Sequence, residues 1–214
     1  MTDSEPGGCC RCCCSFIFTL GLTSLFMWLS LRVDNPKCSV QYFYLPALNK
    51  TLGLNTSTNS TLDFQLSLDN GNKDKGIYYD AVNVTFHDNP NRSLSHLMGD
   101  YTILGFYQGH QKKAKKGGSV ELNRTLLSRA VFPNGSAVFR VDMATRVRFK
   151  ILFWKTKKYS LVREASVEVN DQGIKVNKKG IRLNSSAPQP GYYRALVGVF
   201  LSSLVLISLN FGIF

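Results

Sequence analysis

Five cysteines near the start of the chain are the first residues whose type and spacing could support chemistry. They are Cys9, Cys10, Cys12, Cys13 and Cys14. Their C-x-x-C spacings would suit zinc, but a structural zinc site needs a second pair of ligands beyond a loop. Because an uncharged apolar run follows at once, the pattern favours acylation by palmitate over metal binding or unmodified thiols. N-myristoylation is excluded, since the second residue is Thr2 and not glycine.

Asn-x-Ser/Thr tripeptides, the acceptors of N-linked glycans, are the second chemical signal. The chain holds eight of them, at Asn49, Asn55, Asn59, Asn83, Asn91, Asn123, Asn134 and Asn184. Chance would give about two in a chain with this content of Asn, Ser and Thr. We therefore predict that the chain enters the secretory pathway, with residues 32 onward outside the cell and glycosylated. For any single tripeptide, an ordinary polar surface is the alternative.

Histidine and carboxylate side chains do not gather into a catalytic pattern. His87, His96 and His110 are scattered along the chain, and the glutamates beyond the N-terminal tail form no motif with them. The sequence has no nucleophile elbow, no Gly-rich phosphate loop and no metal-ligand spacing. We therefore predict that the protein is not an enzyme and that it has no catalytic residue, cofactor or metal site.

The formal net charge of +12 is unevenly distributed. Residues 32–100 carry six Lys/Arg and seven Asp/Glu, a net charge of −1, whereas residues 101–186 carry eighteen and five, a net charge of +13. A basic half of this strength attracts polyanions. The candidate contacts lie in segment 111–118, which we predict to be a loop, and on one face of a later strand. They are Lys112, Lys113, Lys115, Lys116, Arg146, Arg148 and Lys150.

An exterior location decides which polyanion such residues could meet. Outside a cell the candidates are acidic cell-wall polysaccharide and anionic lipid headgroups, so we predict no nucleic-acid partner. A solvated lysine loop without a ligand is the alternative for segment 111–118.

Two apolar runs bound the chain. Residues 15–31 carry no charge and are long enough to cross a bilayer as a helix, and the exit from this run lacks a small-x-small cleavage site. We predict an uncleaved signal anchor there rather than a cleaved peptide, with residues 1–14 as a cytoplasmic Cys-rich tail.

The second apolar run covers residues 195–214. Small residues, then a spacer, then an apolar tail form the pattern of a GPI-attachment signal. Asn184 and Ser185 are the predicted attachment residues, and 187–214 form the spacer and tail. A retained second helix is the alternative.

The middle of the chain has the pattern of a mainly β protein. Leu62, Phe64, Leu66 and Leu68 alternate with polar residues, and a longer alternation covers 137–154, where a bend or bulge is expected near 142–145. Several such runs separated by turns predict an antiparallel β-sandwich, immunoglobulin- or fibronectin-III-like, over residues 32–186. Cys38 has no external partner for a disulfide, and the apolar alternation after it predicts that it is buried.

Four motifs together resemble the plant harpin-induced-like and non-race-specific disease resistance family. They are Asn89-Pro90-Asn91, FYQGH at 106–110, FPNGS at 132–136 and FKILFWKTKKY at 149–159. The resemblance covers essentially the whole chain, and the lysine segment and the apolar C-terminal run are part of it.

This resemblance implies a β-sandwich of the group-2 late-embryogenesis-abundant kind at the plasma membrane. It also implies a role in immune signalling upstream of intracellular resistance receptors, with a membrane-associated immune regulator as the cytoplasmic partner. Tethering of the membrane to the cell wall is a further implied role. The alternative is a stress-protective domain of the late-embryogenesis type.

Overall fold

The computed structural model describes residues 7–49, 60–130 and 136–185 of the chain. The chain divides into two compact units, Val33–Ala187 and a second unit that comprises Met1–Arg32 and Pro188–Phe214. Three predicted glycan acceptors, Asn55, Asn59 and Asn134, lie outside the described residues. The predicted spacer and apolar tail, 187–214, also lie outside them.

Helix α1 spans Gly7–Leu31 and contains the predicted anchor segment. The hydroxyl of Thr19 donates to the carbonyl oxygen of Ser15, and that of Thr23 donates to the carbonyl oxygen of Thr19 at 2.9 Å. The helix therefore satisfies these hydroxyls internally, one turn back. Within the described part of the chain, no helix reaches the length and hydropathy required to cross a bilayer, so the predicted membrane span is not confirmed.

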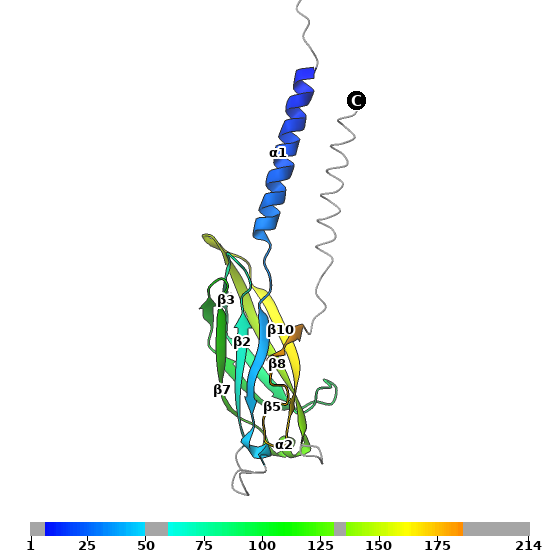
Figure 1. The fold of residues 1–214 in the computed structure, drawn as a ribbon, viewed down its shortest axis with the longest axis vertical. Coiled ribbons are helices and arrows are strands. Elements are labelled where there is room, and N and C mark those ends of the chain that lie inside the picture. Colours follow the sequence, from blue (N-terminus) through cyan, green and yellow to red (C-terminus); the bar gives the residue numbers. More distant parts are fainter. Residues whose placement is uncertain (1–6, 50–59, 131–135, 186–214) are drawn as a thin grey trace, which may run out of the picture. The chain divides into compact units, whose positions relative to one another are not determined.

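The unit Val33–Ala187 is built from two antiparallel sheets, in agreement with the predicted mainly β fold (Figure 1). In order, the four-stranded sheet consists of β11 (Ile181–Arg182), β1 (Lys37–Tyr44), β2 (Thr61–Asp69) and β7 (Lys113–Glu121). In order, the main path of the eight-stranded sheet is β12 (Asn184–Ser185), β10 (Tyr159–Val169), β8 (Ala137–Ile151), β3 (Gly76–Tyr79) and β6 (Phe106–Gln108). Off this path lie β4 (Val82–His87), β5 (Leu97–Ile103) and β9 (Trp154–Lys155). A 3-10 turn, η1 (Pro46–Leu48), and a short helix, α2 (Arg124–Ala130), complete the described elements.

Aromatic side chains join the inner faces of the two sheets. The ring centroid of Phe43 on β1 lies 5.7 Å from that of Phe139 on β8, and Phe64 on β2 lies 5.0 Å from Phe86 on β4. All four side chains are buried in one core cluster. Alternate residues of a strand point to opposite faces, which explains why the period of two in the sequence identifies this core. The immunoglobulin- or fibronectin-like type of sandwich is not confirmed.

Strand β8 is the longest strand described, with fifteen residues, and it lies beside β10 along the domain (Figure 1). Its register with β10 is continuous, so β8 does not carry the bulge that was one of the two alternatives predicted near 142–145. The irregularity lies in the neighbouring chain instead. Tyr79 pairs with Val147, but Asn83 pairs with Ala144. Three residues, 80–82, therefore lie opposite two residues of β8, 145–146. The extra residue is accommodated between β3 and β4, and β8 stays regular.

Segment 111–118 was predicted to be a loop, but only Gln111 and Lys112 lie in a turn. Residues from Lys113 onward form β7, which pairs with β2 at the edge of the four-stranded sheet. Two glycines permit this pairing, because a Cβ on Gly117 would collide with the backbone oxygen of Phe64. A Cβ on Gly118 would collide with the ring of Tyr101. The glycines therefore serve close packing in a strand, although next to lysines they resemble a flexible loop.

Cys38 is buried in the core, as the sequence predicted. Burial raises the pKa of Cys38 to about 12, and the positive charge of Arg163 offsets only part of this effect. The thiol therefore stays protonated at physiological pH and is a poor nucleophile.

We predict that Gly117→Ala lowers the free energy of unfolding by about 1–3 kcal/mol, because the obstacle to the new methyl group is backbone that cannot rotate away. Gly71→Ala is the matched control, since nothing lies within 4 Å of a Cβ at that position. Urea titration of both variants checks this. Equal midpoints for the two would contradict the tight packing of β7 on β2.

Candidate functional site

The structure places the predicted polyanion residues on two different sheets. Lys113 and Lys115 project from the outer side of β7, whereas Arg146, Arg148 and Lys150 follow β8 on the outer face of the eight-stranded sheet. Lys113 lies 3.7 Å from the carboxylate of Asp69. The predicted set is therefore divided between the two sheets.

Two more members of the predicted set differ in their environment. The ammonium group of Lys116 lies 4.9 Å from the ring centroid of Phe106 and is half-buried. Lys112 is exposed in the turn before β7, where its backbone oxygen accepts a hydrogen bond from the side chain of Gln108. Of the seven residues, Lys116 is thus the one with an intramolecular cation–π partner.

Aromatic rings stand beside the arginines of β8. The rings of Tyr78 and Tyr107 lie 4.5 Å apart, and the ammonium group of Lys155 lies 4.3 Å from the ring centroid of Tyr78. Arg148 is the register partner of Tyr78. We call Tyr78, Tyr107, Arg146, Arg148 and Lys155 the basic-aromatic face.

Gly76 makes room for this arrangement, because a Cβ there would collide with the ring of Tyr107. One carboxylate borders the face: Asp80 accepts a hydrogen bond from Lys158 at 2.8 Å. That hydrogen bond, aided by the charges of Lys158, Arg148 and Arg146, lowers the pKa of Asp80. Sequence reasoning missed the aromatic part of this face because Tyr78 and Tyr107 come from β3 and β6, which are distant in the sequence from β8.

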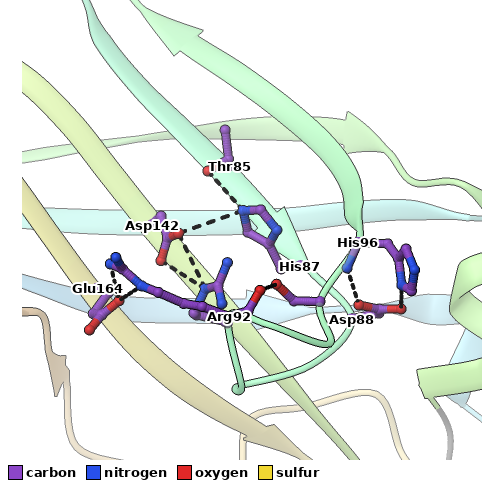
Figure 2. Close-up of polar contacts among 9 residues, drawn as sticks. Thr85, His87, Asp88, Arg92, His96, Asp142 and Glu164 are labelled. Carbon is purple, nitrogen blue, oxygen red and sulfur yellow. Dashed lines mark hydrogen bonds and ion pairs between the residues drawn. The ribbon is translucent and has the colours of Figure 1, made fainter. Parts of the chain in front are cut away.

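A polar network lies on the outer face of the same sheet, nearer the start of β8 than the basic-aromatic face is, and Figure 2 shows its contacts. It consists of His87 on β4, Arg140 and Asp142 on β8, Glu164 on β10, and Arg92 from the loop between β4 and β5. His87 Nε2 lies 3.6 Å from Asp142 Oδ2, and Arg140 Nε donates to both carboxylate oxygens of Asp142 at 3.2 Å. Arg92 Nε donates to Glu164 at 2.9 Å and so ties the loop to the sheet.

The network is unusual in its burial. Arg140 is only 6% exposed. Two buried side-chain nitrogen atoms of the described residues have no hydrogen-bond partner, and they are Arg140 Nη1 and His87 Nδ1. Burial is the main cause that lowers the pKa of His87, and the positive charges of Arg140 and Arg92 act in the same direction. Asp142 and Asp88 oppose the shift.

This geometry does not form a nucleophile–base relay. The hydroxyl of Thr85 lies 3.3 Å from His87 Nε2, the same nitrogen that faces Asp142. In a catalytic triad the nucleophile and the orienting carboxylate contact opposite ring nitrogens. The network is thus built to hold a loop and three strands together. Within the described residues, no group of His, Cys, Asp and Glu is arranged to hold a metal ion.

The described sequons lie in different local structures. Asn83, Asn91, Asn123 and Asn184 are exposed, on β4, in the loop after it, before α2 and on β12. The Asn91 side-chain oxygen accepts a hydrogen bond from the Ser93 hydroxyl at 2.8 Å, and Asn123 accepts one from the Thr125 hydroxyl at 2.6 Å. Asn123 also accepts from the Thr125 backbone N–H and so caps α2. Glycan occupancy stays a prediction.

Asn184 and Ser185, the predicted lipid-attachment residues, form the short edge strand β12, where they pair with Glu164 and Arg163 of β10. Asn49 directly follows η1. The backbone of Cys9 through Cys14 belongs to α1. The predicted modifications at these positions stay predictions.

No family model matches the chain. Among curated proteins, the chain is 58% identical over 177 residues to Protein NDR1 of Arabidopsis thaliana, which covers 80% of this chain and 80% of that protein. A solved structure of a protein from Archaeoglobus fulgidus covers 63% of this chain and 95% of its own, with 13% identity and a TM-score of 0.31. A structural likeness this weak carries no argument.

We predict that the free energy of unfolding increases as the pH is raised between two limits. The lower limit is the lowered pKa of His87 in the folded chain, and the upper limit is its ordinary pKa of 6.5. The unfolded chain binds the His87 proton in this range and the folded chain does not, so lowering the pH favours unfolding. His87→Gln should flatten this part of the stability profile.

Denaturant midpoints measured across that pH range check this expectation. Thr85→Ser, which changes the contact of His87 without removing a titrating group, should keep the slope of the wild type. An unchanged slope in His87→Gln would contradict the assignment.

Proposed function

The chain belongs to the non-race-specific disease resistance family of plant proteins, and from this premise we propose that it acts in plant defence signalling as an anchored plasma-membrane protein. In this proposal the protein works upstream of intracellular resistance receptors and is not an enzyme. The identity to the Arabidopsis relative across four fifths of both chains is the observation that carries the proposal.

Two features of the chain support a membrane location with the β domain outside the cell. Residues 15–31 are uncharged and helical, and Phe16, Phe18 and Phe26 on this helix are exposed. Asn83, Asn91 and Asn123, each in a sequon, are exposed on the β domain, where a glycan could be attached. In this arrangement the Cys-rich tail of residues 1–14 is cytoplasmic, can be palmitoylated, and is the contact for a membrane-associated immune regulator.

The exterior domain would meet acidic cell-wall polysaccharide through the basic-aromatic face. Arg146 and Arg148 offer positive charge, and the half-exposed ring of Tyr107 offers an apolar surface on which a sugar ring can stack. Lys113 and Lys115 on the edge of the other sheet, and Lys112 in the turn before it, add long-range attraction. A domain that tethers membrane to wall in this way is consistent with the lack of a catalytic relay in the polar network.

Sidedness can be tested on intact plant cells that express the full chain. We expect glycan-cleaving enzymes to increase its electrophoretic mobility and phosphatidylinositol-specific phospholipase to release the domain from the cell surface. Release without a mobility change would contradict the glycan sites. Protein that neither enzyme touches, and that is protected from external protease, would contradict the exterior location.

Polysaccharide contact can be tested with pectate. We expect the double variant Arg146→Gln, Arg148→Gln to bind immobilised pectate about three- to fivefold more weakly than the wild type, because each exposed ion contact is worth about 1 kcal/mol or less. Lys178→Gln with Lys179→Gln removes the same charge from exposed positions elsewhere and is the matched control.

Tyr107→Ala should also weaken pectate binding, and its effect should persist at high salt, where the charge effect is screened. Equal losses in the arginine variant and the lysine control would show attraction by net charge alone. That result would remove the basic-aromatic face from the proposal.

A further inference from the structure

The turn between β8 and β9 exposes three large apolar side chains in a row. Leu152 is 75% exposed, Phe153 is 99% exposed and Trp154 is 53% exposed. Leu152 has a backbone φ of 52°, in the left-handed region that a bulky residue seldom adopts. We call residues 152–154 the apolar tip. Consecutive exposed apolar side chains on a tight turn are costly in water and indicate a surface that is covered in use.

Lysines surround the apolar tip. Lys150 and Lys155 pair across the hairpin, and Lys157 follows within two residues and is exposed. The tip thus combines side chains that partition into acyl chains with cations that meet phosphate groups. This combination is typical of segments that lie in a membrane interface, with apolar residues inserted and lysines at the headgroup level.

The tip lies at the end of the domain where the chain enters from α1. The Asp34 backbone N–H donates to Asn72 Oδ1 at 2.9 Å, and Asn72 Nδ2 donates back to the Asp34 oxygen at 2.8 Å. The loop that holds Asn72 leads into β3, where Gly76 pairs with Lys150. Figure 1 shows the β8–β9 hairpin at the end of the domain from which β1 begins.

The linker to the proposed anchor is short. Only Arg32 and Val33 separate Leu31, the last residue of α1, from Asp34. From Leu31 to Asp34 the chain makes three residue-to-residue steps, which span about 10 Å at most when the backbone is fully extended. An anchor in the bilayer would therefore keep this end of the domain, and the tip with it, close to the headgroups.

We propose that the apolar tip and its lysines contact the bilayer that holds the chain, with the tip inserted among the acyl chains and Lys150, Lys155 and Lys157 on anionic headgroups. This proposal rests on the membrane location proposed above. The occupant is a lipid surface, because the tip is a short apolar turn flanked by Lys150, Lys155 and Lys157, whose charge is complementary to lipid phosphate.

The chain contains two tryptophans, Trp28 in α1 and Trp154 in the tip, so each can report on its own position. The full chain is reconstituted in phosphatidylcholine vesicles with about one fifth phosphatidylglycerol. In the Trp28→Phe variant, we expect brominated acyl chains to quench Trp154, and iodide to quench it poorly. In the Trp154→Phe variant, Trp28 reports whether the anchor itself is inserted.

Trp28 and Trp154 together distinguish a tip that does not contact lipid from an anchor helix that is not inserted in the bilayer. Trp28 quenched by brominated lipid while Trp154 stays open to iodide would overturn the tip contact alone, and would point to a protein partner for the tip. Trp28 left unquenched would overturn the membrane location and the tip contact together.

Variants that leave the core intact test the two parts of the contact in the Trp28→Phe background. Phe153→Ser removes the most exposed side chain of the tip and should reduce quenching of Trp154 by brominated lipid at least about threefold. Lys155→Gln with Lys157→Gln should reduce it to the level seen in phosphatidylcholine alone. Lys178→Gln with Lys179→Gln is the matched control and should leave it unchanged. Equal quenching in all variants would overturn the proposal.

Discussion

The packing of aromatic rings between the two sheets is the contact on which the rest of the domain depends. Phe43 against Phe139 and Phe64 against Phe86 each join a strand of one sheet to a strand of the other. Cys38 has no cysteine partner in this domain and its thiol is buried, so no disulfide formed by Cys38 adds to the stability of the domain. Loss of one such ring would cost about 3–5 kcal/mol, which is a large part of the stability of a domain of this size.

Strand β8 links that core to the polar network, the basic-aromatic face and the apolar tip. Its inner side carries the rings and aliphatic groups, and its outer side carries Arg140 and Asp142 of the polar network and then Arg148 of the basic-aromatic face. It ends at the hairpin that presents the apolar tip. A regular strand of fifteen residues can do this because the irregularity is placed between β3 and β4, so its side chains keep strict alternation.

The two surfaces proposed for function have different physical requirements. The basic-aromatic face needs rings and cations from β3, β6, β8 and β9 at one place, and Gly76 must be small enough for Tyr107 to lie over it. The apolar tip needs only consecutive residues and a turn. This difference explains why the motif FKILFWKTKKY could be noticed in the sequence while its neighbours Tyr78 and Tyr107 were not connected to it.

The sequence by itself determined the mainly antiparallel β fold, the alternation of β2 and β8, the burial of Cys38 and the family, since strand periodicity and family motifs are local properties of the chain. Tertiary structure decided what local patterns cannot encode. The lysine segment became an edge strand because β2 offered unpaired backbone groups and Gly117 allowed close approach. His87, Arg140 and Glu164 came together because strand register is set by long-range pairing, and the register of β4 depends on one extra residue placed before it.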